Sequence, residues 1–214
     1  MSLFIFYLLV VVLGILSMGF QMLASRLLSP HFGSTIIVWA WLVTTFLAAF
    51  STGSILGGLV SKLPSARRVP LQIGTALLAV VSLAVISFRA GAILTHIELT
   101  VIPDVRAMND PDLLNKALFI SCFGLFFVPV TMLSSFGPQC VGWLAARGQA
   151  PGAASGLVYG VSTLGNIAGV MLTTFVLLPH FGVTALLFGW LGVAVLSLSS
   201  LICILRTAPL NSAK

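Results

Sequence analysis

The sequence has 214 residues, of which 59% are hydrophobic and only 7% are charged, and its mean hydropathy is +1.17. A water-soluble domain carries about 25% charged residues, so this composition excludes a soluble globular protein and favours one domain with a lipid-facing exterior. The net charge of +6 does not indicate nucleic-acid binding, because the basic residues are mostly scattered rather than gathered on one solvated face.

Six apolar stretches are each long enough to cross a bilayer as a helix, which takes about 20 residues. In chain order, we expect spans at 3–24, 35–60, 70–88, 117–133, 153–178 and 183–205. The first stretch lacks the basic start of a signal peptide and exceeds its short apolar core, so we expect an uncleaved span. The sequence therefore predicts an all-α integral membrane bundle of about six transmembrane helices in a single domain, 1–214.

A polar stretch at 95–116 separates the third and fourth spans and holds every acidic residue of the chain: Glu98, Asp104, Asp110 and Asp112. We expect it to form an outer loop, either solvated or in contact with a partner. Asp110-Pro111 is a helix-start signal for the fourth span, since Asp can cap a helix and Pro suits its first position. Gly137-Pro138 interrupts the end of that span, and we expect a short interfacial helix at 139–146.

Loop charges predict the orientation of the bundle. Six basic residues fall on one side of a six-span arrangement: Lys62, Arg67, Arg68, Arg147, Arg206 and Lys214. Four fall on the other side, with the acidic stretch: Arg26, Arg89, Arg106 and Lys116. The positive-inside rule then places both termini in the cytoplasm, and we expect the chain in a bacterial inner membrane.

Glycines recur at four-residue spacing in the second and fifth spans. They are Gly53, Gly57 and the adjacent Gly58, then Gly152, Gly156 and Gly160, then Gly165 and Gly169. Each set lies along one helix face, where another backbone can approach closely, and such packing joins helices in lipid. The spacing leaves open whether these faces pack within the bundle or bind a partner protein or a lipid.

Three polar residues lie in or near the membrane part of the predicted spans. Gln21 and Asn166 are each able to hydrogen-bond across helices, for about 0.6–2 kcal/mol, or to contact a substrate. Arg26 follows Gln21 by one to two turns, and we expect its side chain to extend to the interface. No Asp or Glu falls inside a predicted span, which argues against proton-coupled transport.

The sequence offers no catalytic, cofactor or metal site. Cys122, Cys140 and Cys203 have no CxxC spacing, and we expect them to be small apolar residues. His31 and His180 lie in two similar outer turns, but a metal site normally has three or four ligands. We expect the tryptophans to form an aromatic belt at the lipid headgroups: Trp39, Trp41, Trp143 and Trp190.

The run from Gln21 to Ser34, then Trp39, then Gly-Ser-Ile-Leu-Gly-Gly at 53–58, resembles the start of the membrane region of spermidine synthase-like proteins. Phe136-Gly137-Pro138, the glycines of 152–169, and Val176–Pro179 with Gly182 extend the resemblance over most of the chain outside 95–116. It implies a bundle similar to half of a major-facilitator transporter, which this family often joins to a soluble aminopropyltransferase-like domain.

The chain departs from the family pattern in three respects. The family often has a glutamate where Gln21 stands and an acidic residue where Ser61 stands. These residues also contain no Gly-rich nucleotide loop of the kind that the soluble domain would need. The resemblance therefore implies at most the membrane partner of a separately encoded aminopropyltransferase-like enzyme.

Three hypotheses for function follow. The first is a non-catalytic membrane subunit that anchors, scaffolds or stabilises a larger membrane complex through its glycine-rich faces. The second is a small-molecule transporter in which two six-span halves form a homodimer around a path lined by Gln21, Arg26 and Asn166. The third is an enzyme acting on a lipid through Arg26, His31 and the acidic loop, for which the sequence shows no nucleophile–base pair.

Overall fold

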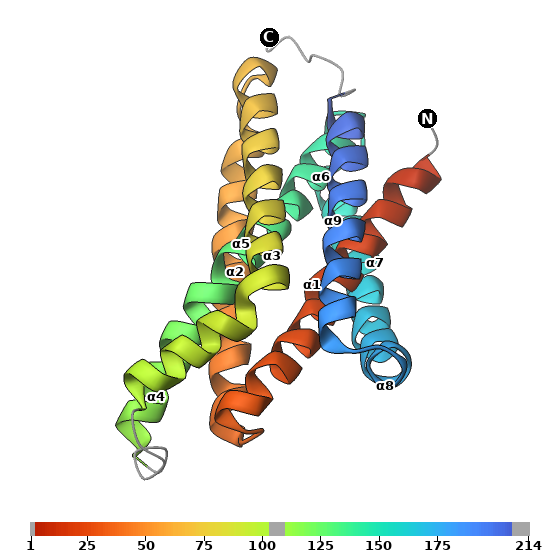
Figure 1. Ribbon diagram of the computed structural model, residues 1–214. Helices are drawn as coiled ribbons and strands as arrows, with labels where there is room; N and C mark the ends of the chain where they lie inside the picture. The colour runs from red at the N-terminus through yellow and green to blue at the C-terminus, as the bar shows by residue number, and fades with distance from the viewer. Residues whose placement is uncertain (1–2, 103–109, 207–214) are drawn as a thin grey trace.

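The structure is a computed structural model that describes residues 3–102 and 110–206, and within those ranges every regular element is a helix (Figure 1). The elements are α1 (Leu3–Phe32), α2 (Ile36–Ser61), α3 (Ser65–Val101), α4 (Pro111–Cys122), the π-helix η2 (Phe123–Phe127), α5 (Val128–Ser134), α6 (Phe136–Ala145), α7 (Pro151–Met171), the π-helix η3 (Leu172–Leu177), α8 (Leu178–His180) and α9 (Val183–Leu205). Six stretches of this described part are long and apolar enough to cross a membrane: 3–32, 36–61, 65–101, 111–145, 151–180 and 183–205. The prediction of an all-helical chain with six such stretches is confirmed.

The predicted outer loop at 95–116 is wrong in its extent. Residues 95–101 form the last two turns of α3, and α4 already begins at Pro111, whereas 103–109 lie outside the described residues. The helix continues because Leu94, Ile97 and Val101 keep an apolar face of helical spacing on the core. At the start of α4 the carboxylate of Asp110 accepts the N–H of Asp112 at 3.0 Å, which is the cap that the sequence predicted.

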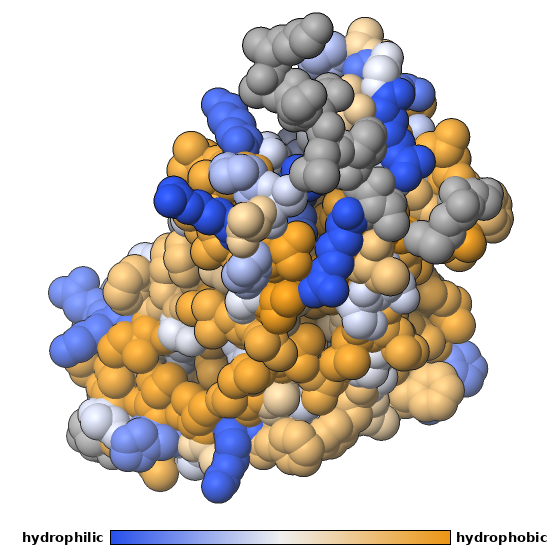
Figure 2. Space-filling model, turned by 90° about the horizontal axis from the view of Figure 1, so that it is seen from above, coloured by the Kyte–Doolittle hydropathy of each residue, from blue (hydrophilic) through white to orange (hydrophobic). Residues whose placement is uncertain are grey.

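The helix α1 crosses the bundle diagonally and packs mainly against α7 and α9 (Figure 1). On the other side, α2 packs against α5 and α6, while α3 packs against α9 and α5. The first turn of α1 and the last turn of α9 lie at the same end of the bundle. Figure 2 looks down on that end, where hydrophilic side chains gather and hydrophobic ones surround them.

The contact between α1 and α7 is a contact of backbones. A Cβ added at Gly165 would collide with the carbonyl oxygen of Val11, and one at Gly14 would collide with the carbonyl oxygen of Ser162. A Cβ at Gly169 would lie 2.7 Å from the carbonyl oxygen of Ile15. Any larger residue at these positions would therefore have to push the two helices apart.

The remaining predicted glycines divide into packed and open positions. Gly53 faces Thr131 and Ser134 of α5, and Gly57 faces the backbone of Ser135 at the α5–α6 junction, each too closely for a Cβ. Four others have nothing within 4 Å of an added Cβ in the described structure: Gly58, Gly152, Gly156 and Gly160. Only some of the predicted glycines thus pack against another helix. At the start of α7, the glycine face has no neighbouring helix in the described structure.

Both π-helical stretches come just before a proline. Pro129 follows η2 by two residues, and Pro179 follows η3 by two. Proline has no N–H to donate and its ring crowds the carbonyl one turn earlier, so a wider turn before it relieves the clash. In η3 this wider turn carries Thr173 and Thr174, both of which face inward.

We predict that Gly165→Ala lowers the free energy of unfolding by about 1–3 kcal/mol, because its methyl group has to displace the α1 backbone. Gly160→Ala is the matched control on the same helix, and it should cause no loss, since the space around Gly160 is open. Thermal unfolding in mild detergent, followed by tryptophan fluorescence, measures both. Equal midpoints for the two variants would contradict the backbone contact described above.

Candidate functional site

Two hollows lie one after the other along the length of α1, between α2 and the stretch 151–180. The Arg26 hollow encloses about 320 Å³ and is lined by Met22, Ser25, Arg26, Ser29, Gly33, Ser34, Val38, Trp39, Leu42, Thr174 and Leu178. The Asn166 hollow encloses about 200 Å³ and is lined by Val10, Leu13, Ser17, Met18, Phe50, Ser54, Leu133, Ser134, Gly137, Cys140, Val158, Tyr159, Ser162 and Asn166. Together they form the candidate site.

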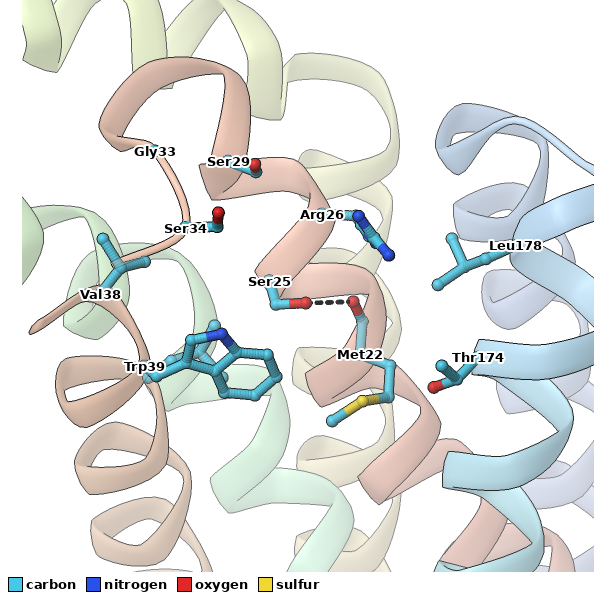
Figure 3. A pocket seen from close by; sticks show the side chains of 11 residues that line it. Met22, Ser25, Arg26, Ser29, Gly33, Ser34, Val38, Trp39, Thr174 and Leu178 are labelled. Carbon is cyan, nitrogen blue, oxygen red and sulfur yellow. Dashed lines mark hydrogen bonds between the residues drawn. The ribbon is translucent and has the colours of Figure 1, made fainter. Parts of the chain in front are cut away.

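The Arg26 hollow is charged on one wall and apolar on another (Figure 3). Arg26 extends from α1 into the space in front of Leu178 and Thr174, and Trp39 of α2 faces it from the opposite side. The hydroxyl of Ser25 is already used, because it donates to the carbonyl oxygen of Met22 at 2.8 Å. Arg26 makes no ion pair with any residue in the described ranges.

The hydroxyl of Thr174 is buried in the wall of this hollow and has no hydrogen-bond partner in the described structure. Thr174 and Arg26 also border a neighbouring hollow of about 350 Å³ that extends past Pro179 to Val183. Arg26 therefore lies between these two hollows, next to the unpartnered hydroxyl of Thr174.

Polar side chains line part of the Asn166 hollow, midway along the candidate membrane spans. On one side, Ser17 donates to the carbonyl oxygen of Leu13 at 2.8 Å, and Ser134 donates to that of Ala49 at 3.3 Å. Asn166 and Tyr159 project from α7, and within the described residues no hydrogen bond joins either side chain to another group. The α7 wall thus presents polar groups that the bundle itself does not satisfy.

The three predicted polar residues do not form one site. Arg26 lines the first hollow and Asn166 the second, whereas Gln21 is only 8% exposed and lines neither. A shared path lined by all three, as the transport hypothesis expected, is not what the described structure shows.

A side-chain contact that the sequence did not predict joins α1 to α3. His31 Nδ1 lies 2.7 Å from Glu98 Oε2, and both side chains are partly buried. His180 instead contacts the carbonyl oxygen of Val176 at 2.7 Å, so the two histidines do not pair. In the part of the chain that the structure describes, no three His, Cys, Asp or Glu side chains gather as a metal would need.

Two tryptophans expected in the headgroup belt are buried among the helices. The indole N–H of Trp190 donates to the carbonyl oxygen of Leu16 at 3.1 Å, and that of Trp143 donates to the carbonyl oxygen of Ile204 at 3.0 Å. Each indole finds an acceptor on a neighbouring helix and can therefore be buried, and the belt at the headgroups stays a prediction. Hydrogen bonds to carbonyl oxygens of other helices distinguish them from the exposed Trp39, and the local sequence does not predict these bonds.

Comparison of the chain with models of known families, with curated proteins and with solved structures found no match. The resemblance to the membrane region of spermidine synthase-like proteins therefore stays a prediction. The function has to be argued from the two hollows and from the surface that surrounds them.

We predict that Asn166→Leu leaves the stability of the isolated chain unchanged, since no hydrogen bond within the described bundle is lost and the hollow has room for leucine. Trp190→Phe should instead lower it by about 1 kcal/mol, because the bond to the Leu16 carbonyl disappears. Unfolding midpoints in the same detergent measure both variants. Marked destabilisation by Asn166→Leu would show that Asn166 is bonded within the bundle.

Proposed function

We propose that the chain is a non-catalytic, multi-pass membrane subunit that anchors, scaffolds or stabilises a larger membrane complex. The observation that carries this proposal is the open face of α7. Gly152, Gly156 and Gly160 are exposed there at four-residue spacing, with nothing within 4 Å of an added Cβ in the described structure. The stretch 151–180 is also the least buried of the six candidate spans, with 17% of its apolar window inside the bundle.

A lipid-facing surface does not need such a glycine face. Elsewhere the exposed helix surfaces carry large apolar side chains, as at Leu47, Leu77, Phe88 and Leu196. These side chains fill the space between lipid tails, whereas glycine exposes the polar backbone and weakens a helix. Small residues at four-residue spacing favour close contact with another helix.

The polar wall of the Asn166 hollow supports the same conclusion. Hydrocarbon offers no hydrogen bonds, so unsatisfied side-chain groups at membrane depth are costly. Asn166 and Tyr159 lie on α7 with no partner in the described ranges, a short distance along the helix from the glycine face. We infer that the partner is a membrane-spanning helix with hydrogen-bonding side chains.

The proposal includes the orientation and the setting. Lys62 follows α2, Arg67 and Arg68 lie in the first turn of α3, Arg147 follows α6 and Arg206 follows α9. This supports a cytoplasmic position for that end and for both termini, in a bacterial inner membrane. A separately encoded aminopropyltransferase-like enzyme is one candidate member of the complex, as the sequence resemblance suggests.

A second candidate function is transport by a homodimer of six-span halves. The observation that favours it is the succession of two hollows along α1, which a second copy would join into a path. Substrate flux through proteoliposomes that contain only this chain would support it. Absence of flux with a broad panel of small molecules would argue against transport and favour the membrane-subunit function.

We predict that Gly156→Leu reduces co-purification of the partner subunit about tenfold, the effect of losing roughly 1.4 kcal/mol of association free energy. Leucine there would hold the partner helix away from α7. The matched control is Gly91→Leu on α3, an equally open glycine on a different side of the bundle, which should co-purify as the wild type does.

The measurement is mass spectrometry of the tagged chain purified natively in mild detergent. A stoichiometric second protein that is lost with Gly156→Leu alone supports the proposal. A chain that purifies alone as a homodimer would overturn the heteromeric subunit and make transport the leading function. Equal loss with both leucine variants would show that the α7 face is not the interface.

A further inference from the structure

We propose that the Arg26 hollow binds a phosphate-type oxyanion, held by the guanidinium of Arg26 and the hydroxyl of Thr174. This site is separate from the α7 glycine face and does not depend on the proposed partner. The ligand chemistry fits either the phosphate of a lipid headgroup or a free phosphate, and the experiment below distinguishes these sources.

Arg26 carries its charge within a candidate membrane span. It lies six residues before the end of α1 at Phe32, which corresponds to about 9 Å along the helix axis. Arg26 is exposed, and a cation within a membrane-spanning helix normally pairs with an acid, with backbone carbonyls or with a bound anion. Glu98, at the same end of the bundle, is engaged by His31, and no described acid pairs with Arg26.

Several hydroxyl groups line the hollow around Arg26. The Thr174 hydroxyl is buried, unpartnered among the described residues and part of the same wall. Ser29 and Ser34 add two further hydroxyls to the lining, and the lining contains no Asp or Glu. A cavity with one guanidinium, several hydroxyl donors and no carboxylate is complementary to an oxyanion, because charge-assisted hydrogen bonds to arginine are the strongest available.

The size and the walls of the hollows beside Arg26 favour an amphiphile. About 320 Å³ beside Arg26, with about 350 Å³ in the adjoining hollow, exceeds what a single phosphate group needs. The remaining walls are apolar and come from Met22, Trp39 and Leu42. A charged rim above an apolar wall suits an amphiphile whose phosphate meets Arg26 and whose hydrocarbon lies against these side chains.

The test uses the full chain, first stripped of bound lipid by extensive detergent exchange. One arm titrates phosphatidylglycerol, with phosphatidylcholine as the zwitterionic comparison, and counts bound lipids by native mass spectrometry. The other arm titrates inorganic phosphate and follows the unfolding midpoint. Each arm is run on the wild type, Arg26→Gln, Thr174→Val and Arg89→Gln.

Arg26→Gln should weaken binding at least tenfold, and Thr174→Val should weaken it severalfold without changing the volume of the side chain. Arg89 of α3 is exposed, as Arg26 is, but it lines neither hollow around Arg26, so Arg89→Gln should bind within about twofold of the wild type. Arg26→Lys should restore part of the affinity, since the charge returns without the planar fork.

Phosphatidylglycerol binding with this pattern of variants identifies a lipid headgroup as the ligand. Binding of inorganic phosphate alone, with the same pattern, identifies a free anion. The proposal is overturned if neither probe binds the wild type, or if Arg89→Gln weakens binding as much as Arg26→Gln does. Unfolding midpoints of all variants without ligand show whether any loss reflects misfolding, and Thr174→Val provides a test independent of charge.

Discussion

The backbone contact between α1 and α7 determines how the rest of this bundle is arranged. In lipid, apolar side chains gain little by leaving hydrocarbon, so helices associate through close packing and interhelical hydrogen bonds. Gly14 on α1 and Gly165 and Gly169 on α7 bring the two backbones to a distance that no side chain permits. The helix α7 packs mainly against α1 and otherwise chiefly against α6. Its opposite face therefore has no neighbouring helix in the described structure.

Hydrogen bonds from tryptophans complement this contact on the other side of α1. Trp190 of α9 reaches the carbonyl oxygen of Leu16, near Gly14 and Gly19, and an added Cβ at Gly19 would meet the same indole at 2.6 Å. The middle of α1 is therefore held between a glycine contact with α7 and an indole from α9. Eleven residues, about three turns, separate Val11, Gly14 and Ile15 from Met22, Ser25 and Arg26, so the Arg26 hollow lies on the continuation of the α1 face that contacts α7.

The sequence could predict the six apolar stretches, because a span needs only length and composition, and it could predict which glycines share a face. The sequence could not predict which of the two glycine faces of α7 packs against α1. From Gly160 to Gly165 is five residues, which at 3.6 residues per turn rotates the helix by about 140°. The first three glycines of α7 therefore point away from α1, while Gly165 and Gly169 point toward it. That choice depends on which residues of α1 lie opposite.

The local sequence pattern also cannot predict contacts between segments that are far apart in the chain. The polar stretch 95–116 predicts a loop at Glu98, yet Glu98 lies on the helical face that continues from Leu94, and only the fold brings His31 to it. The same holds for the similar turns around His31 and His180. Gly33 takes a positive φ of 74°, which glycine favours, whereas Gly182 precedes α9 with an extended backbone at φ −68°. Two similar sequences thus follow their helices with different backbone conformations.

The two proposals concern opposite ends of one continuous helical stretch, 151–180, and they rest on the same physical argument. At its first turns, three glycines leave one helix face without side chains; near its last turns, the Thr174 hydroxyl is buried without a partner among the described residues, beside an unpaired Arg26. Each arrangement costs free energy for the isolated chain in a membrane. A bound helix would relieve the first and a bound oxyanion the second, so the surface of this stretch is best explained by what it binds.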